Sequence, residues 1–384
     1  MTDPLRVAML THVYYPSPQV GGAERQQAEI APFLKELNVD LHIVTRSVPG
    51  APTHEILDGV SVHRVPSIGP RSFASLSYTA MGLRTLQHLK PDVLHAHIMF
   101  SPARTAVYMK RLTGTPVIVT AHRSGPPGDI QRLQRRRFGE GQIKLLRNHV
   151  DTFIAISSEI DSEMEEIGIP REKRASLPNG VDAKRFAPLP AAERKAMRQT
   201  LGLPEDVPIV IYAGRLNPVK RVNNVLAIWP DILEKHPDAL LLILGTGEDE
   251  PALRQQAGEG VRFEGLVQNV VPYLQASDIF VLPSVAEGFS VAVLEALSCE
   301  LAAVITDVGG ARDVIRHGEN GWLIQPDNLD DIREAFLALL GDADRRRAIG
   351  QAGRADILKD YQLSVIAERL RGIYDAAVAA RKPL

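Results

Sequence analysis

The chain has 384 residues, of which 45% are hydrophobic and 23% are charged. These proportions exclude a disordered or membrane-embedded chain, and the length fits two ordinary domains. The single cysteine, Cys299, excludes an internal disulfide, as is usual in a reducing compartment. The sequence has no run of the roughly 20 apolar residues that a membrane span needs, and the start lacks the basic residues and apolar run of a signal peptide. We therefore expect a cytoplasmic protein.

The net charge of −2 is unevenly distributed along the chain. Residues 1–180 contain 21 Lys and Arg against 17 Asp and Glu, whereas the remainder contains 23 against 29. A basic first half suggests that this half meets an anionic partner. A chance distribution is the alternative.

The first half alternates short apolar runs with longer amphipathic ones. Strands are predicted at 7–11, 40–45, 60–65, 92–96, 116–120 and 152–156. Helices are predicted at 22–37, 76–89 and 102–112. This alternation is typical of parallel βαβ units, whose strands are covered on both faces and so read as continuous apolar runs.

The second half repeats the pattern. Strands are predicted at 208–213, 239–244, 261–263, 279–282 and 302–305, and helices include 291–298 and 329–340. A proline-rich, polar stretch at 182–206 has the composition of a linker. We predict an α/β chain of two Rossmann-like, doubly wound domains, residues 1–185 and 186–361, with a last helix at about 362–384 that packs back on the first domain. Such sheets bind ligands beyond the carboxyl ends of their strands, so a cleft between facing domains is the expected site.

Two features of the first half are candidates for that site. Gly21 and Gly22 stand at a predicted helix start, where bare N–H groups attract phosphate or another anion; a purely conformational turn is the alternative. His122 ends a buried strand, from which it could bind a sugar hydroxyl, although a structural role is also open. His95 and His97 form a similar pair, but a metal site would need a third ligand at a recognisable spacing.

Two features of the second half follow predicted strands. Gly214-Arg215 ends one strand and Lys220 comes five residues later, so two cations beside a helix start could neutralise a diphosphate. Glu287 and Gly288 follow another strand, and the helix beginning there carries Glu295 among apolar neighbours, where a carboxylate needs a partner such as ribose hydroxyls. Solvated surface charges are the alternative in both cases.

Together these motifs resemble the retaining glycosyltransferases of family 4, which have the GT-B fold. The resemblance runs nearly end to end. It rests on Gly-Gly-x-Glu at 21–24, His122, Ser157-Ser158, Asn179-Gly180-Val181-Asp182, Gly214-Arg215 with Lys220, and Glu287-x7-Glu295.

The resemblance implies a role for each matching residue. The catalytic group would be His122, Glu287, Arg215 and Lys220. The donor-binding residues would be Gly214, Arg215, Lys220, Val267, Glu287, Gly288, Phe289, Ser290, Val291 and Glu295. Within this set, Arg215 and Lys220 would grip the diphosphate, Glu295 the ribose, and Val267 the base through its backbone. Gly21 and Gly22 would lie on the acceptor or phosphate side.

The resemblance also implies the reaction. A sugar would pass from a nucleotide-diphosphate donor to a hydroxyl acceptor with retention of configuration, without a metal or other cofactor. The base stays open, with UDP favoured and GDP-mannose next. Arg123, after His122, departs from the pattern of many relatives and could meet an anionic acceptor. A non-transferring nucleotide-sugar-binding protein and an epimerase-type GT-B protein are the alternatives.

The stretch 132–147 is basic and interrupted by two glycines. Basic amphipathic helices can lie on anionic membranes, so this stretch predicts peripheral contact with the inner face of the cytoplasmic membrane and a lipid-linked acceptor. A solvated helix is the alternative. Nucleic acid is not expected, because no nucleic-acid-binding signature accompanies the charge.

Overall fold

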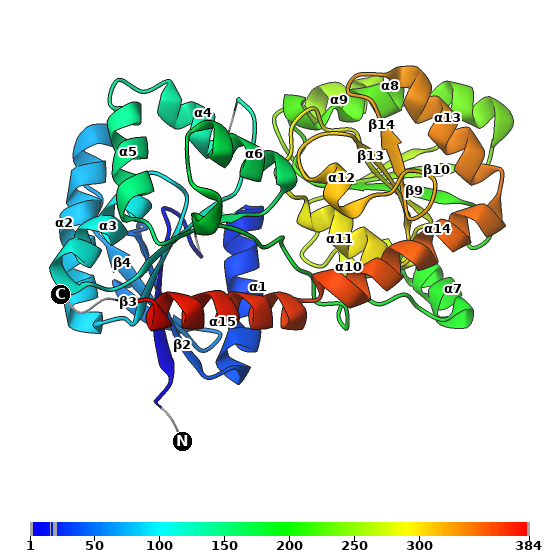
Figure 1. Cartoon of the computed structure of the whole chain (residues 1–384). Coiled ribbons are helices and arrows are strands. Elements are labelled where there is room, and N and C mark those ends of the chain that lie inside the picture. Colours follow the sequence, from blue (N-terminus) through cyan, green and yellow to red (C-terminus); the bar gives the residue numbers. More distant parts are fainter. Residues whose placement is uncertain (1–2, 16, 18–20, 127, 382–384) are drawn as a thin grey trace. The chain divides into compact units, whose positions relative to one another are not determined.

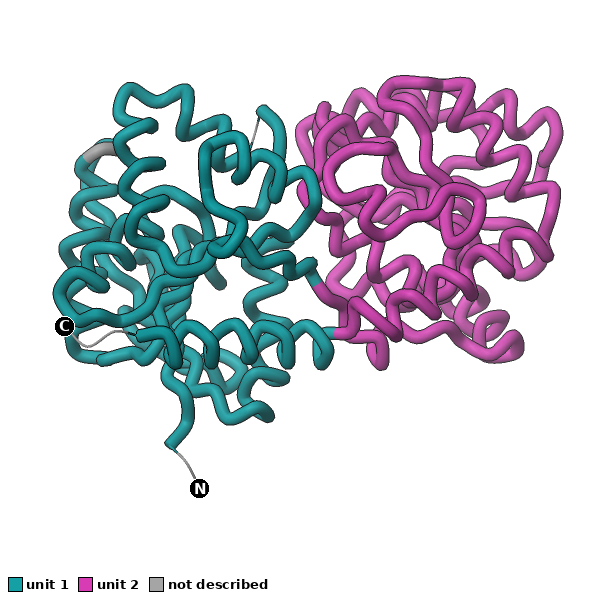
Figure 2. The backbone as a smooth tube through the Cα atoms, in the orientation of Figure 1, with its two compact units in different colours: residues 1–179, 363–384 teal, residues 180–362 magenta. Residues whose placement is uncertain are grey.

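The computed structural model describes residues 3–15, 17, 21–126 and 128–381. Within them the chain forms two compact units (Figure 2). Unit 1 comprises Met1–Asn179 together with Leu363–Leu384, and unit 2 comprises Gly180–Gln362. No described helix is both long enough and apolar enough to cross a membrane.

Unit 1 is built on an eight-stranded sheet of order β3-β4-β2-β1-β5-β6-β7-β8. The strands are β1 (Leu5–Leu10), β2 (Val39–Arg46), β3 (His54–Leu57), β4 (Val60–Val65), β5 (Val93–His97), β6 (Val117–Ala121), β7 (Thr152–Ala155) and β8 (Arg174–Ser176). All neighbours are parallel except β3, which forms an antiparallel edge with β4. The six strands predicted for this half are confirmed within two residues, whereas the short edge strands β3 and β8 escaped prediction because they lack a long apolar run.

Helices cover both faces of this sheet (Figure 1). They are α1 (Gly22–Glu36), α2 (Arg71–Leu89), α3 (Ser101–Thr113), α4 (Asp129–Gln134), α5 (Gly139–His149), α6 (Ser158–Glu166) and α15 (Leu363–Ala379), with a 3-10 turn at Arg171–Lys173. Helix α1 packs beside α15, and α2 packs beside α3.

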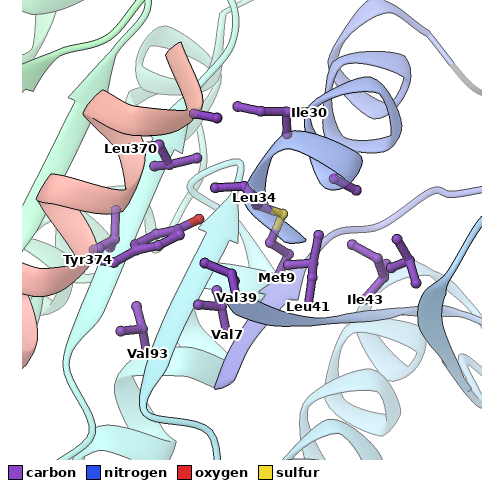
Figure 3. Close-up of a cluster of buried hydrophobic side chains, with 14 of the residues drawn as sticks. Val7, Met9, Ile30, Leu34, Val39, Leu41, Ile43, Val93, Leu370 and Tyr374 are labelled. Carbon is purple, nitrogen blue, oxygen red and sulfur yellow. The ribbon is translucent and has the colours of Figure 1, made fainter. Parts of the chain in front are cut away.

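The C-terminal helix α15 is part of the core of unit 1 (Figure 3). Its Leu370 and Tyr374 are buried with Val7 and Met9 of β1 and with Leu34 of α1. Burial of such side chains stabilises a domain by about 1.5–3 kcal/mol each. The last helix therefore belongs to the same hydrophobic core as the first strand.

Unit 2 is built on a six-stranded, all-parallel sheet of order β11-β10-β9-β12-β13-β14. The strands are β9 (Ile209–Ala213), β10 (Leu240–Leu244), β11 (Val261–Gly265), β12 (Ile279–Leu282), β13 (Ala302–Thr306) and β14 (Trp322–Ile324). The helices are α7 (Ala191–Thr200), α8 (Val222–Lys235), α9 (Glu250–Gln256), α10 (Val271–Ala276), α11 (Val291–Ser298), α12 (Ala311–Val314), α13 (Leu329–Leu340) and α14 (Ala343–Asp356), with a 3-10 turn at Pro218–Lys220 and a π-turn at Ile357–Tyr361.

Both sheets are doubly wound. In unit 2 the chain lays down β9, β10 and β11 in one direction and then returns to place β12 on the other side of β9. In unit 1 the same reversal separates β1 from β5. Ligands of such sheets bind beyond the carboxyl ends of the strands at this reversal. The loops after β9 and β12, and those after β1 and β5, are therefore the places where function is expected.

Candidate functional site

The strongest charged contact at the reversal of unit 2 joins the loops after β9 and β12. Lys220 Nζ lies 2.5 Å from Glu287 Oε1, and the two side chains are 22% and 18% exposed. They are 67 residues apart in sequence. The sequence predicted that both residues follow strands, and the sheet order brings the two strand ends together.

The backbone around this pair is held by bonds between loops. The Val285 N–H donates to the Val219 carbonyl over 2.9 Å, which ties the loop after β12 to the loop after β9. The Leu216 N–H donates to the Thr246 carbonyl over 2.9 Å, which ties in the loop after β10. These bonds fix the backbone that leads to Lys220.

Two glycines allow this close approach. A Cβ on Gly245, whose φ is +124°, would lie 1.9 Å from the Gly214 carbonyl oxygen. A Cβ on Gly309, whose φ is +59°, would lie 2.4 Å from the carbonyl oxygen of Glu287. A side chain cannot fit at either distance, and positive φ favours glycine. Neither glycine belongs to a predicted site motif, although Gly245-Thr246-Gly247 follows a predicted strand.

Arg215 differs from Lys220 in its exposure and its contacts. Its side chain is exposed, and among the described residues it makes no hydrogen bond or ion pair. The Tyr212 hydroxyl donates to the Arg215 carbonyl over 2.9 Å and holds the backbone at this point. The guanidinium is therefore available to a ligand at the end of β9.

The loop after β12 leads into α11. Its N-cap, Ser290, makes no side-chain capping bond within the described part of the chain, and the first turn holds no acid. Uncapped N–H groups at a helix start favour an anion. Phe289 is buried and stacks on Tyr361 with ring centroids 5.8 Å apart, so this aromatic pair fixes the start of the helix.

A pocket lies at the same place in unit 2. Its lining includes Glu287, Gly288, Phe289 and Ser290 from the loop before α11, and Thr306 and Gly310 from the end of β13 and the loop after it. The Gly310 N–H donates to the Gly288 carbonyl over 2.7 Å. The loop after β13 thus forms the opposite wall.

The other residues predicted to bind the donor lie in or near these loops. Val291 begins α11 and is buried, and Glu295 is buried on the same helix at 3% exposure. Val267 is half-buried in the loop after β11, next to Leu266, which is 80% exposed. All ten predicted donor-side residues belong to unit 2, and their ligand-binding roles remain predictions.

The predicted His122 belongs to a histidine cluster in unit 1. Its Nε2 lies 2.9 Å from His97 Nδ1, and the two rings stack. His97 stacks in turn beside His95, whose Nδ1 lies 2.8 Å from the hydroxyl of Tyr374 and whose Nε2 lies 2.7 Å from the hydroxyl of Thr120. Helix α15 therefore reaches the strand-end histidines through a hydrogen bond.

These rings are neutral at neutral pH. Burial first, and then Arg123, lowers the pKa of His122 to about 4. Burial lowers the pKa of His95 to about 3 and that of His97 well below its ordinary value. A neutral imidazole can donate one hydrogen bond and accept another. In the described residues, no three His, Cys, Asp or Glu side chains gather as metal ligands.

The glycines at the start of α1 differ from the expectation of bare N–H groups. The Gly21 N–H donates to Glu24 Oε2 over 2.9 Å, as in a capping box. Its N–H is thus already used within the chain, because the acid of the Gly-Gly-x-Glu motif folds back on it. Gly22 has open space where a side chain would stand, and Arg123 is exposed.

The basic stretch 132–147 forms parts of α4 and α5 with a turn between them. Its apolar residues Leu133, Ile143 and Leu146 are buried within unit 1, whereas Phe138 is 77% exposed. A Cβ on Gly139 would lie 1.6 Å from the Leu133 carbonyl oxygen, which explains the glycine in the turn. Most of the apolar face is therefore used for internal packing.

Two family models match the chain, one in each half. The model described as "Glycosyltransferase Family 4" matches residues 20–185, and the model described as "Glycosyl transferases group 1" matches residues 193–356. The chain belongs to the family 4 glycosyltransferases. It is therefore a sugar-transferring enzyme, and its two α/β units form the GT-B fold.

Curated relatives of this glycosyltransferase are also named as sugar-transferring enzymes. The chain is 32% identical over 209 residues to the GDP-mannose-dependent monoacylated alpha-(1-6)-phosphatidylinositol monomannoside mannosyltransferase of Corynebacterium glutamicum, which covers 51% of this chain and 55% of that protein. It is 24% identical over 366 residues to the N-acetyl-alpha-D-glucosaminyl L-malate synthase of Bacillus anthracis, which covers 93% of this chain and 94% of that protein.

Solved structures share the fold. The sucrose-phosphate synthase of Thermosynechococcus elongatus superposes with a TM-score of 0.82 at 19% identity, over 98% of this chain and 99% of that one. The Anabaena protein Alr3699/HepE, solved in complex with UDP-glucose, superposes with a TM-score of 0.78 at 19% identity, over 97% and 99%. At such identities the likeness concerns the fold alone.

Proposed function

We propose that this glycosyltransferase takes its sugar from a nucleotide-diphosphate donor bound in unit 2, at the reversal between β9 and β12. The observation that carries the proposal is the Lys220–Glu287 pair, together with the exposed Arg215 in the same loop after β9 and the uncapped start of α11. A cation on each side of a diphosphate, together with helix N–H groups, stabilises it in the ground state and as a leaving group.

The roles within the site follow from chemistry and position. Arg215 and Lys220 hold the diphosphate, and Glu287 accepts from hydroxyls of the transferred sugar while it keeps Lys220 in place. Glu295, buried on α11, accepts from the ribose. The backbone N–H groups of 289–291 bind sugar and phosphate, and the backbone of Val267 meets the base.

The transfer retains configuration without a metal ion. The departing phosphate, held by Arg215 and Lys220, takes the proton of the incoming hydroxyl on the same face of the sugar. His122 helps to position the sugar, and its low pKa keeps it neutral as a hydrogen-bonding partner. The family resemblance supports this route.

We propose uracil as the first candidate for the base and guanine as the second. The solved Anabaena protein binds UDP-glucose, and the mannosyltransferase relative uses GDP-mannose. We keep the UDP-sugar as the first candidate and GDP-mannose as the second. The acceptor offers a hydroxyl, and several relatives are named for phosphorylated or lipid-linked sugars and inositols, which supports an anionic or lipid-linked acceptor here.

A thermal-shift screen tests the donor. UDP, GDP and ADP and their sugars are added to the whole protein and to Arg215→Gln and Lys220→Met variants, with Lys235→Met as the matched control on α8. A nucleotide at one hundred times its Kd stabilises the folded state by about 2.7 kcal/mol. We expect one base to give a shift that both site variants lose and the control keeps. Equal shifts in all four proteins would contradict the assignment.

We also propose that the stretch 132–147 makes peripheral contact with the membrane. With Leu133, Ile143 and Leu146 buried and Leu145 half-buried, Phe138 is the exposed apolar side chain of this stretch. Sedimentation with anionic vesicles tests it, using Phe138→Ser against wild type. Equal sedimentation of the two proteins would remove this stretch as the contact.

A further inference from the structure

Four arginines from four different parts of unit 1 act electrostatically on one histidine. Arg46 ends β2, Arg104 lies on α3, Arg132 lies on α4, and Arg136 follows α4. The histidine is His12, which follows β1. Burial lowers the pKa of its ring to about 3, and the positive charges of the four arginines contribute to this shift. The group lies beyond the carboxyl ends of β2 and β1, next to the reversal between β1 and β5.

Direct contacts connect the group. The ring of Tyr78 contacts both His12 and Arg46, with the Arg46 guanidinium 5.8 Å from the ring centroid. His12 Nε2 lies 2.5 Å from the hydroxyl of Ser101. Next to Ser101, the ring of Phe100 stacks under the guanidinium groups of Arg132 and Arg136 at 5.0 Å and 4.3 Å. Aromatic rings thus hold three of the four cations in fixed places.

Three of the four arginines have no acidic partner among the described residues. Arg46, Arg104 and Arg132 form no ion pair with a carboxylate of the described chain. Asp129 is the acid near Arg132, but burial raises its pKa to about 6 and its Oδ2 already accepts from the Met99 N–H. Arg46 Nε is buried without a hydrogen-bond partner in the described residues. Buried donors normally have a hydrogen-bond acceptor. The Nε–H of Arg46 lacks one among the described residues, so it could bind an acceptor atom of a ligand.

We propose that this arginine group, Arg46, Arg104, Arg132 and Arg136, binds a phosphate group of the sugar acceptor. The inference rests on the proposed function and specifies the acceptor. Arginine forks match phosphate oxygens geometrically, and a phosphate carries more charge and more acceptor atoms than a carboxylate. Four convergent guanidinium groups suit such a group better than a neutral sugar. Binding there would anchor the acceptor at the strand ends that carry His97 and His122.

The test uses the whole protein with labelled histidine, in which His12→Gln identifies the His12 ring signal by NMR. Glycerol 3-phosphate is titrated against glycerol, with and without the nucleotide diphosphate that stabilises the enzyme. We expect glycerol 3-phosphate, and not glycerol, to shift the His12 signal in both cases. Arg46→Gln and the more exposed Arg136→Gln should each weaken binding about ten- to a hundredfold. Arg84→Gln, an exposed arginine of α2 outside the group, should not.

A second arm identifies the source of the phosphate. Phosphatidylglycerol vesicles are compared with phosphatidylcholine vesicles by sedimentation of the same variants. A response to glycerol 3-phosphate supports a soluble acceptor, and a response to phosphatidylglycerol alone, lost in both arginine variants, supports a lipid headgroup. No His12 shift, together with vesicle binding equal in Arg46→Gln, Arg136→Gln and Arg84→Gln, overturns the inference. If the nucleotide still binds in that case, the proposed function stands while this inference falls.

Discussion

Lys220→Met is the sharpest test of the donor site, because one contact decides both stability and rate. The substitution keeps the length of the side chain and removes its charge. In the free enzyme it leaves Glu287, 18% exposed, without its cation. Exposed pairs contribute about 0–1 kcal/mol, and losing one partner of a buried pair costs about 3–5 kcal/mol. For a pair about one-fifth exposed we expect a loss of about 1–3 kcal/mol in unfolding free energy.

The effect on transfer should be larger than the effect on folding. Removing one preorganised donor from a developing negative charge costs about 100- to 1,000-fold in rate. Steady-state sugar transfer and urea unfolding are measured on Lys220→Met, on Glu287→Gln and on the double variant, with Lys235→Met as control. The double variant should regain stability, because it also removes the carboxylate charge that faced Lys220, yet stay inactive. A near-normal rate in Lys220→Met would refute the phosphate role of this lysine.

Three further outcomes are expected. Gly245→Ala should cost about 2–4 kcal/mol in urea unfolding and lower transfer, because its Cβ would meet the Gly214 carbonyl oxygen, whereas Gly258→Ala, with open space around it, should behave like wild type; equal stabilities would contradict the packing of these loops. The histidine cluster should make stability depend on pH: burial lowers the pKa of His95 to about 3 in the folded state from near 6.5 when unfolded, so stability is complete above about pH 6.5 and is lost as pH falls toward about 3. His95→Gln should reduce that slope by about 1.4 kcal/mol per pH unit in urea titrations, and an unchanged slope would count against a neutral, buried His95. Chelator should leave sugar transfer intact and added Mg²⁺ should not raise it; loss of transfer that Mg²⁺ restores would end the metal-independent route.

The local pattern predicted most regular elements well. The helices 291–298 and 329–340 and the strands 60–65 and 279–282 are found with the predicted bounds. Long apolar runs and helical periodicity act over a few residues, so they can be recognised without tertiary structure. The edge strands β3 and β8 could not be recognised in this way, because hydrogen bonding to a neighbouring strand, rather than an apolar run, defines them.

The candidate sites also combine features that the local sequence predicts with contacts that only the fold determines. The position of Arg215, Lys220 and Glu287 after strands is local information, and so is the family motif that they form. That Lys220 pairs with Glu287 depends on which strands are neighbours, since β9 lies beside β12 and not beside β11. The hydrogen bond between His95 and Tyr374 joins residues 279 positions apart. The Gly21 N–H was misjudged because a side chain three residues away folds back on it.

By itself, then, the sequence determined most of the strands and helices, the family and the residues that stand at strand ends, since these depend on short-range chemistry. The tertiary structure alone decided which of those residues meet. The arginines around His12 come from β2, α3 and the α4 region, and no spacing in the chain relates them. They gather because a doubly wound parallel sheet collects the carboxyl ends of its strands at one edge, where distant charges share one environment.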